Sequence, residues 1–138
     1  MRRVTKIIVH CTATPLGREV SVAEVDAWHR AQGFRCIGYH YLVGLDGGVH
    51  AGRPEHEVGA HCKGQNAFSV GVAYVGGLDA DGEPADTRTS QQREALRQLV
   101  IELSKRYPGA TVHGHREFAV KACPCFDAAA EYADCGKH

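Results

Sequence analysis

Three side chains in the sequence carry donor atoms of the kinds that a catalytic zinc site uses. His10 follows an apolar stretch, and His115 and Cys123 lie eight residues apart in a later segment without clear periodicity. Zinc binds imidazole nitrogen and thiolate sulfur, and a catalytic site typically uses three protein ligands and leaves the fourth position to water. Two histidines and a cysteine would make such a set. The spacing matches no short metal-binding motif, however, and alone it fits better with a core histidine, an exposed histidine and a buried thiol.

The elements expected around these residues alternate between strands and helices. Residues 4–9 are rich in β-branched side chains and predict a buried strand that presents His10 at its end. Further strands are expected over residues 39–43, 49–52, 69–75 and 111–113, with a hairpin turn at residues 46–48. Helices are expected from a Ser21/Glu24 capping box to Gly33, from Thr89 or Ser90 to Pro108, and over residues 128–133. Because a hairpin excludes a purely parallel sheet, we predict one α/β domain over residues 1–138, with a mixed central sheet flanked by helices.

The composition indicates a globular chain with little attraction for polyanions. Lys plus Arg and Asp plus Glu each number 16, so the formal net charge is zero. We therefore expect no nucleic-acid or anionic-lipid partner. The basic residues Arg2, Arg3 and Lys6 precede an apolar stretch that His10 interrupts, which is too short for a signal peptide or a membrane span. We expect synthesis in a reducing cytosol, where the six cysteines would mostly stay free, bind metal or do chemistry.

A series of short motifs runs from about residue 4 to residue 127. They are VHCTAT at 9–14, WH at 28–29, QG at 32–33, GYH at 38–40, DG at 46–47, AGR at 51–53, GAHCKG at 59–64, SVGV at 69–72, VGG at 75–77, HGHRE at 113–117, KACP at 121–124 and FD at 126–127. In this order they resemble type-2 N-acetylmuramoyl-L-alanine amidases, a family that includes small phage endolysins and peptidoglycan recognition proteins. The resemblance implies the α/β fold of this family. It also implies the family's activity, which is hydrolysis of the amide bond between N-acetylmuramic acid and L-alanine of peptidoglycan.

Carried over by position, the resemblance implies that His10, His115 and Cys123 bind zinc. In some cytosolic relatives that recycle wall fragments the third ligand is Asp. Cys123 at the matching position favours the endolysin and recognition-protein branch.

The resemblance further implies that Tyr39 and Lys121 assist the reaction. A tyrosine hydroxyl and a lysine ammonium suit stabilisation of an oxyanion or proton delivery to the leaving nitrogen. Without the resemblance, Tyr39 fits a sheet aromatic and Lys121 a solvated loop charge. His61 falls where the family has a histidine at the cleft rim, which implies substrate binding.

Cys125 departs from the family pattern, which usually has Gly after Cys-Pro. In an extended segment it would point the same way as Cys123, so it could be an alternative ligand, form a disulfide under oxidation, or only fill space. His113 could compete as a ligand. We interpret this residue and His29, His40, His50, His56 and His138 as surface or supporting groups, and Trp28 and Cys62 as packing residues.

Three functions remain open from the sequence. The first is a monomeric phage-type endolysin, made in the host cytoplasm and acting on the wall after membrane permeabilisation. The second is a cytosolic amidase that recycles soluble muropeptides. The third is a peptidoglycan-binding or regulatory protein, including one that contacts a phage polymerase.

Overall fold

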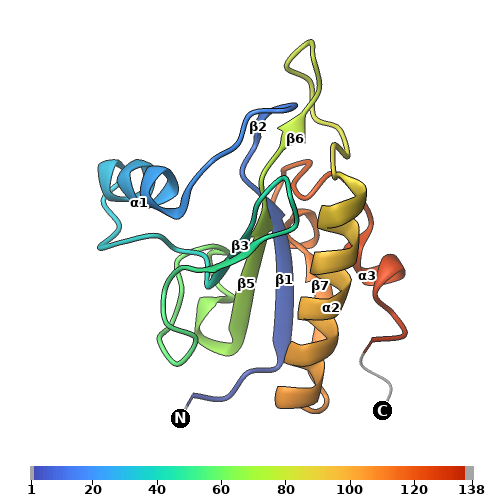
Figure 1. Ribbon diagram of the computed structural model, residues 1–138. Coiled ribbons are helices and arrows are strands. Elements are labelled where there is room, and N and C mark those ends of the chain that lie inside the picture. Colours follow the sequence, from blue (N-terminus) through green and yellow to red (C-terminus); the bar gives the residue numbers. More distant parts are fainter. Residues whose placement is uncertain (1, 136–138) are drawn as a thin grey trace.

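The protein is built around a five-stranded sheet, shown in the computed structural model in Figure 1. The structure describes residues 2–135. The strands follow the order β4-β3-β5-β1-β7, with the bounds Lys6–Cys11 (β1), Tyr41–Val43 (β3), Val49–Ala51 (β4), Ser69–Tyr74 (β5) and Thr111–Gly114 (β7). β1 runs parallel to β5 and β7, β3 runs parallel to β5, and β4 pairs antiparallel with β3. The predicted mixed sheet is confirmed.

β1 lies inside the sheet and is buried on both faces. Ile7, Ile8 and Val9 have no exposed surface, which explains the continuous β-branched run in the sequence. Because side chains alternate along a strand, Ile7 and Val9 point to one face, and Ile8 and His10 to the other. This alternation separates the main core from the face that carries the candidate site.

Helices pack around the sheet (Figure 1). They are α1 (Val22–Ala31), α2 (Ser90–Arg106) and α3 (Ala128–Glu131), with 3₁₀ turns at Asn66–Phe68 (η1) and His115–Glu117 (η2). α2 covers the Ile7 and Val9 face through Leu96, Val100 and Leu103. α1 packs through Val25 in a second apolar cluster that includes Leu42 and Ala73.

Both long helices begin with a capping box, which the sequence predicted for α1, whereas for α2 it offered Thr89 or Ser90 as the cap. Ser21 and Glu24 form it in α1, and Thr89 and Gln92 form it in α2. The buried Gln92 side chain also donates to the carbonyl oxygens of Val43 at 3.3 Å and Val75 at 2.9 Å. One side chain therefore both caps α2 and ties it to the sheet.

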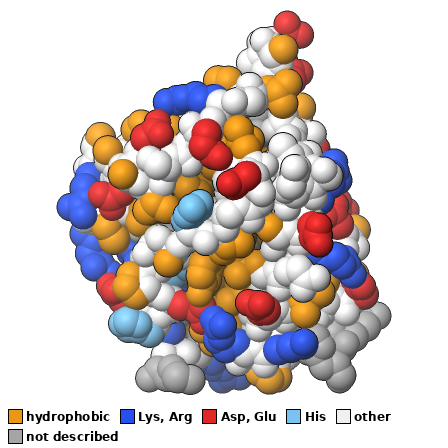
Figure 2. All heavy atoms as spheres, in the orientation of Figure 1, with side chains coloured by type: hydrophobic (Ala, Val, Ile, Leu, Met, Phe, Trp, Pro, Cys, Tyr) orange, Lys and Arg blue, Asp and Glu red, His pale blue; other side chains and the backbone are white. Residues whose placement is uncertain are grey.

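A second, two-stranded sheet of β2 (Thr14–Pro15) and β6 (Gly77–Leu78) extends from the main sheet and was not predicted. On the face drawn in Figure 2, acidic and basic side chains are both widely spread, as expected for a chain of zero net charge. Within residues 2–135, no helix combines the length and apolar character needed to cross a membrane.

Candidate active site

The carboxyl ends of β1 and β7 bring two histidines together. Val9 pairs with Gly114 in the parallel register, so His10 and His115 follow at the same edge of the sheet. Their ring centroids are 4.6 Å apart. Cys123 returns to this edge, and the donor atoms of the three residues lie within 4.8 Å of one another. Two imidazoles and a thiol gathered this closely are a donor set that suits zinc.

The Cys123 thiol is held against β1. Its Sγ accepts a hydrogen bond from the backbone N–H of Cys11 at 3.1 Å, and its carbonyl accepts one from Arg116 N–H at 2.7 Å. Hydrogen bonds from the side chain and backbone of Cys11 lower the pKa of Cys123, although burial acts in the opposite direction. A lowered pKa favours the thiolate, which is the form that binds a metal ion.

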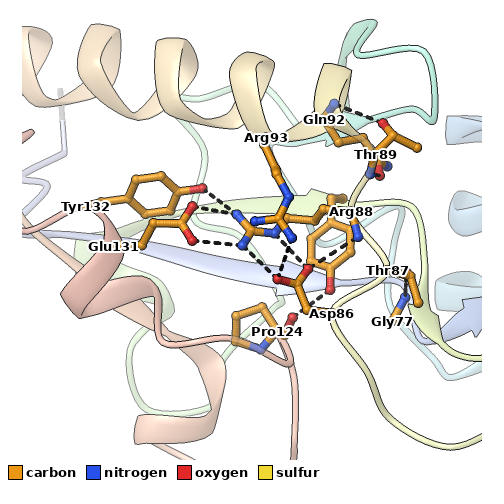
Figure 3. Close-up of polar contacts among 11 residues, drawn as sticks. Gly77, Asp86, Thr87, Arg88, Thr89, Gln92, Arg93, Pro124, Glu131 and Tyr132 are labelled. Atoms are coloured by element: carbon orange, nitrogen blue, oxygen red, sulfur yellow. Dashed lines mark hydrogen bonds and ion pairs between the residues drawn. The ribbon is translucent and has the colours of Figure 1, made fainter.

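A buried arginine anchors the segment that follows Cys123 (Figure 3). Arg88 donates two hydrogen bonds to Asp86 and two to Glu131, at 2.6–2.9 Å. Its guanidinium carbon lies 3.4 Å from the ring centroid of Phe126. These contacts join the loop before α2 to the chain after the cysteine.

A cleft of about 750 Å³ opens over the donor set. Trp28, Tyr39, Lys121, His115 and Cys123 are among the residues that line it. The Tyr39 ring centroid is 5.2 Å from that of His10. Burial, followed by the nearby Cys123 and Cys11 thiols, raises the pKa of Tyr39, so its hydroxyl stays protonated as a donor. Lys121 is exposed at the cleft.

His61 lies directly behind His10. Its Nδ1 is 2.8 Å from Nε2 of His10, and its Nε2 is 3.2 Å from Oγ of Ser69. Although the residue borders the cleft, only 8% of its surface is exposed. Burial lowers the pKa values of His10 and His61 well below the ordinary value, so both rings are neutral. Ser69 was not singled out in the sequence, where its only signal is a polar residue at the start of an apolar strand.

Cys125 does not join the donor set and packs against the main core, which agrees with the possibility that it only fills space and argues against the alternative ligand. Its φ of 71° puts it in the left-handed region, and its Sγ lies 3.5 Å from the carbonyl oxygen of Gly77. The bend turns the thiol away from the direction that an extended segment would give. Within residues 2–135, the only group of donors close enough for one metal ion is His10, His115 and Cys123.

Two other histidines differ in their surroundings. His113 bonds to Thr111 at 2.7 Å and to Glu117 at 2.9 Å, and lies outside the donor set. His40, expected as a surface or supporting group, is 1% exposed; its Nδ1 accepts from Gly71 N–H at 3.0 Å. The prediction for His138 falls outside the described residues.

His29 is the cleft residue whose position the sequence showed least clearly. Its ring centroid lies 5.1 Å from that of Tyr39, and its Nδ1 accepts a hydrogen bond from Gly38 N–H at 2.8 Å. In the sequence, the position of His29 two turns into an amphipathic helix was the main signal for a place in the cleft. Its contact with Tyr39 could not be predicted, because tertiary folding brings the two residues together.

The fold and the site together define an α/β protein whose sheet edge carries a candidate metal centre under an open cleft. Residues 1–126 match the N-acetylmuramoyl-L-alanine amidase family. The chain therefore belongs to the N-acetylmuramoyl-L-alanine amidase family and is an enzyme of that class.

Individual relatives agree with this assignment. The chain is 46% identical to the endolysin of Klebsiella phage KP32 over 126 residues, which cover 91% of this chain and 83% of the relative. It is also 46% identical to the endolysin of Escherichia phage T7 over 121 residues, covering 88% and 80%. Among solved structures, the endolysin amidase LysCS from Clostridium intestinale URNW superposes with a TM-score of 0.81 at 28% identity, covering 96% of this chain and 82% of that one.

Proposed function

We propose that the protein is a zinc-dependent endolysin that hydrolyses the amide bond between N-acetylmuramic acid and L-alanine in peptidoglycan. His10, His115 and Cys123 would hold the ion. The observation that carries the proposal is the convergence of these donor atoms within 4.8 Å, under a cleft, in a chain of the amidase family. The chain and its endolysin relatives share most of their length. This supports the lytic function over a muropeptide-recycling amidase and over a binding or regulatory protein.

Amide hydrolysis needs a strong nucleophile and stabilisation of the charge that develops on the carbonyl oxygen. A bound zinc ion supplies water activation near neutral pH and Lewis acidity. Tyr39 keeps its proton and lies beside His10, so its hydroxyl can donate to the oxyanion. Lys121 borders the open side of the cleft, where its ammonium can reach the oxyanion or protonate the leaving alanine nitrogen.

The peptidoglycan strand is proposed to lie along the cleft. The apolar rings of Trp28 and Phe34 and the polar side chains of Gln32 and Lys63 line its walls. Such a mixture can contact both sugar faces and peptide groups. We further propose that the enzyme is made in the host cytoplasm and reaches the wall after the membrane is permeabilised.

Mass spectrometry of products from purified sacculi tests this function. Wild-type protein should release stem peptides with a free N-terminal alanine. Release should stop with a chelator and with Cys123→Ala. Zinc-loaded protein that releases nothing from sacculi would contradict the lytic function. If that protein then cleaved soluble muropeptides offered in place of sacculi, the result would favour the recycling amidase.

A further inference from the structure

His61 sits in a linear chain of hydrogen-bonding groups that starts at a backbone carbonyl and ends at His10. Ser69 Oγ lies 2.8 Å from the carbonyl oxygen of Gln65 and 3.2 Å from Nε2 of His61. Nδ1 of His61 lies 2.8 Å from Nε2 of His10. Both contacts of His61 are buried, and the contact between Ser69 and Gln65 is partly buried.

The direction of each bond follows from the number of protons available. A carbonyl oxygen only accepts, so Ser69 must give its single hydroxyl proton to Gln65. The Ser69 oxygen can then only accept, which places a proton on Nε2 of His61 and leaves Nδ1 of that ring as an acceptor. His10 must therefore carry its proton on Nε2. Its Nδ1 is left with a free lone pair.

We propose that His61 is a positioning residue that fixes the tautomer and ring orientation of His10, so that Nδ1 of His10 binds the metal ion. The proposal rests on the zinc site proposed above. Ligand histidines commonly use their second nitrogen in this way, and loss of the outer partner typically weakens metal binding. The role replaces the interpretation of His61 as a substrate-binding residue, because both of its ring nitrogens are already occupied by protein groups.

The surroundings hold the His61 ring in one place. A Cβ added at Gly71 would lie 2.5 Å from Cγ of His61, and one added at Gly59 would lie 2.8 Å from its Cδ2. The backbone N–H of His61 donates to Oδ1 of Asn66 at 2.9 Å. Two glycines thus leave room for the ring, and the Asn66 side chain fixes the backbone that carries it.

Zinc affinity, measured by competition with a chelating dye, tests the proposal in the full chain. His61→Phe keeps a flat aromatic ring, although a larger one, and removes both nitrogens, so its zinc dissociation constant should rise about 10–100-fold. His61→Asn keeps an acceptor near the position of Nδ1 and should retain an affinity closer to wild type. Activity lost in His61→Phe should return with excess zinc, whereas a lost substrate contact would raise KM at every zinc concentration. Unchanged zinc affinity in folded His61→Phe would overturn the proposal.

A matched serine pair tests the far end of the chain. Ser69→Ala removes the acceptor for Nε2 of His61 and should weaken zinc binding. Ser104→Ala makes the same change at a buried hydroxyl on α2 that has no hydrogen-bond partner among the described residues, and should leave zinc affinity unchanged. Equal effects of the two changes would contradict the role of Ser69.

Nitrogen-15 NMR of wild-type protein without zinc gives an answer that needs no variant. The proposal requires the proton of His10 on Nε2, and a proton on Nδ1 would overturn it. If the wild-type protein bound no zinc, the proposed zinc site would be wrong. The tautomer of His10 would still show whether the hydrogen-bond chain from Gln65 to His10 is present.

Discussion

Burial controls the protonation of the groups closest to the candidate site. Tyr39 and the rings of His10 and His61 are all held in their neutral forms because the interior disfavours charge. Cys123 differs because hydrogen bonds from Cys11 lower its pKa. The site therefore offers neutral imidazoles, a phenolic donor and a thiol whose hydrogen bonds favour the thiolate form.

Tyr39→Phe should reduce kcat about 100-fold or more, because removal of one oxyanion donor typically costs about 3 kcal/mol. Zinc affinity should not change. Tyr41→Phe is the matched control, since the Tyr41 hydroxyl bonds to Glu55 instead of facing the cleft. Initial rates on sacculi would measure the effect, and equal rates for the two variants would remove Tyr39 from the mechanism.

His40 should make the stability of the zinc-free protein depend on pH. Burial, helped by the charges of Arg2 and Arg53, lowers the pKa of His40 from 6.5 to about 4, although the hydrogen bond to the Glu57 carbonyl and the charge of Glu55 act in the opposite direction. Between these values the unfolded chain takes up a proton that the folded protein excludes. The free energy of unfolding should therefore fall by roughly 3 kcal/mol as the pH drops from 6.5 to 4, with no further loss from this group below that range.

His40→Asn should remove this part of the pH dependence, because asparagine can accept from Gly71 N–H but does not titrate. His50→Asn, at an exposed position on β4, should not. Denaturant unfolding at a series of pH values would measure both. The same slope in wild type and His40→Asn would show that another group is responsible.

At the scale of the elements, the segment from η2 to α3 is held by contacts that are distant in sequence. It carries two of the proposed ligands but contains only short helical turns. The Tyr74 hydroxyl of β5 donates to the carbonyl oxygen of Pro124 at 2.7 Å, and Arg88 holds Asp86 and Glu131 from the other side. The Arg88 side chain is 1% exposed, whereas the side chains of Asp86 and Glu131 are 24% and 35% exposed, so a buried cation meets two partly buried carboxylates.

Arg88→Leu should reduce the free energy of unfolding by about 3–5 kcal/mol, because it leaves two partly buried carboxylates without their partner. Arg93→Leu removes another arginine that contacts Asp86, but one with 51% of its side chain exposed. It should cost less than about 1 kcal/mol. Urea denaturation would compare them. Similar losses would show that the buried network does not stabilise this segment.

Cys125 contributes local strain to the same segment. A left-handed conformation costs a non-glycine residue about 1–2 kcal/mol. The change in the free energy of unfolding for Cys125→Gly should therefore be more favourable, by about 1–2 kcal/mol, than the change for a Cys→Gly substitution at a position with negative φ. Cys36, which is outside the left-handed region, provides the comparison. Thermal unfolding of Cys125→Gly and Cys36→Gly would measure the difference. Equal effects would mean that the thiol contact with Gly77 offsets the strain.

The sequence predicted those elements that local chemistry determines. The capping box at Ser21, the cap at Thr89 or Ser90 and the β-branched run of β1 identify their elements without tertiary information. The two-residue strands β2 and β6 are too short to show a period, so they were missed. The left-handed turn at Cys125 was missed because this chain has no glycine there, although the glycine that the family usually has at this position was a signal for it.

The candidate site was predictable mainly through the resemblance of its motifs. Spacing alone did not connect His10 with Cys123, because a parallel sheet and an irregular loop bring them together. The burial of His40 and the contact between His61 and Ser69 depend on glycines of a neighbouring strand and loop, which make room for the rings. Such space is a property of packing and leaves no pattern along the chain.

For the molecule as a whole, the sheet supplies a rigid edge and the irregular segments supply the chemistry. β1 fixes one proposed ligand in the core, the parallel β7 leads to the second, and the anchored loop returns the third to the same edge. The cleft above this edge is open to a polymer, while α2 buries the opposite face of the sheet. This division joins a stable core to an accessible site.

The most direct test is the zinc stoichiometry of the purified chain, measured by metal analysis after dialysis against a weak chelator. Wild-type protein and Cys36→Ser should each retain one zinc ion per chain, whereas Cys123→Ser should retain none and lose amidase activity. Full zinc occupancy in Cys123→Ser, or full amidase activity in wild-type protein stripped of metal, would contradict a catalytic zinc site at His10, His115 and Cys123.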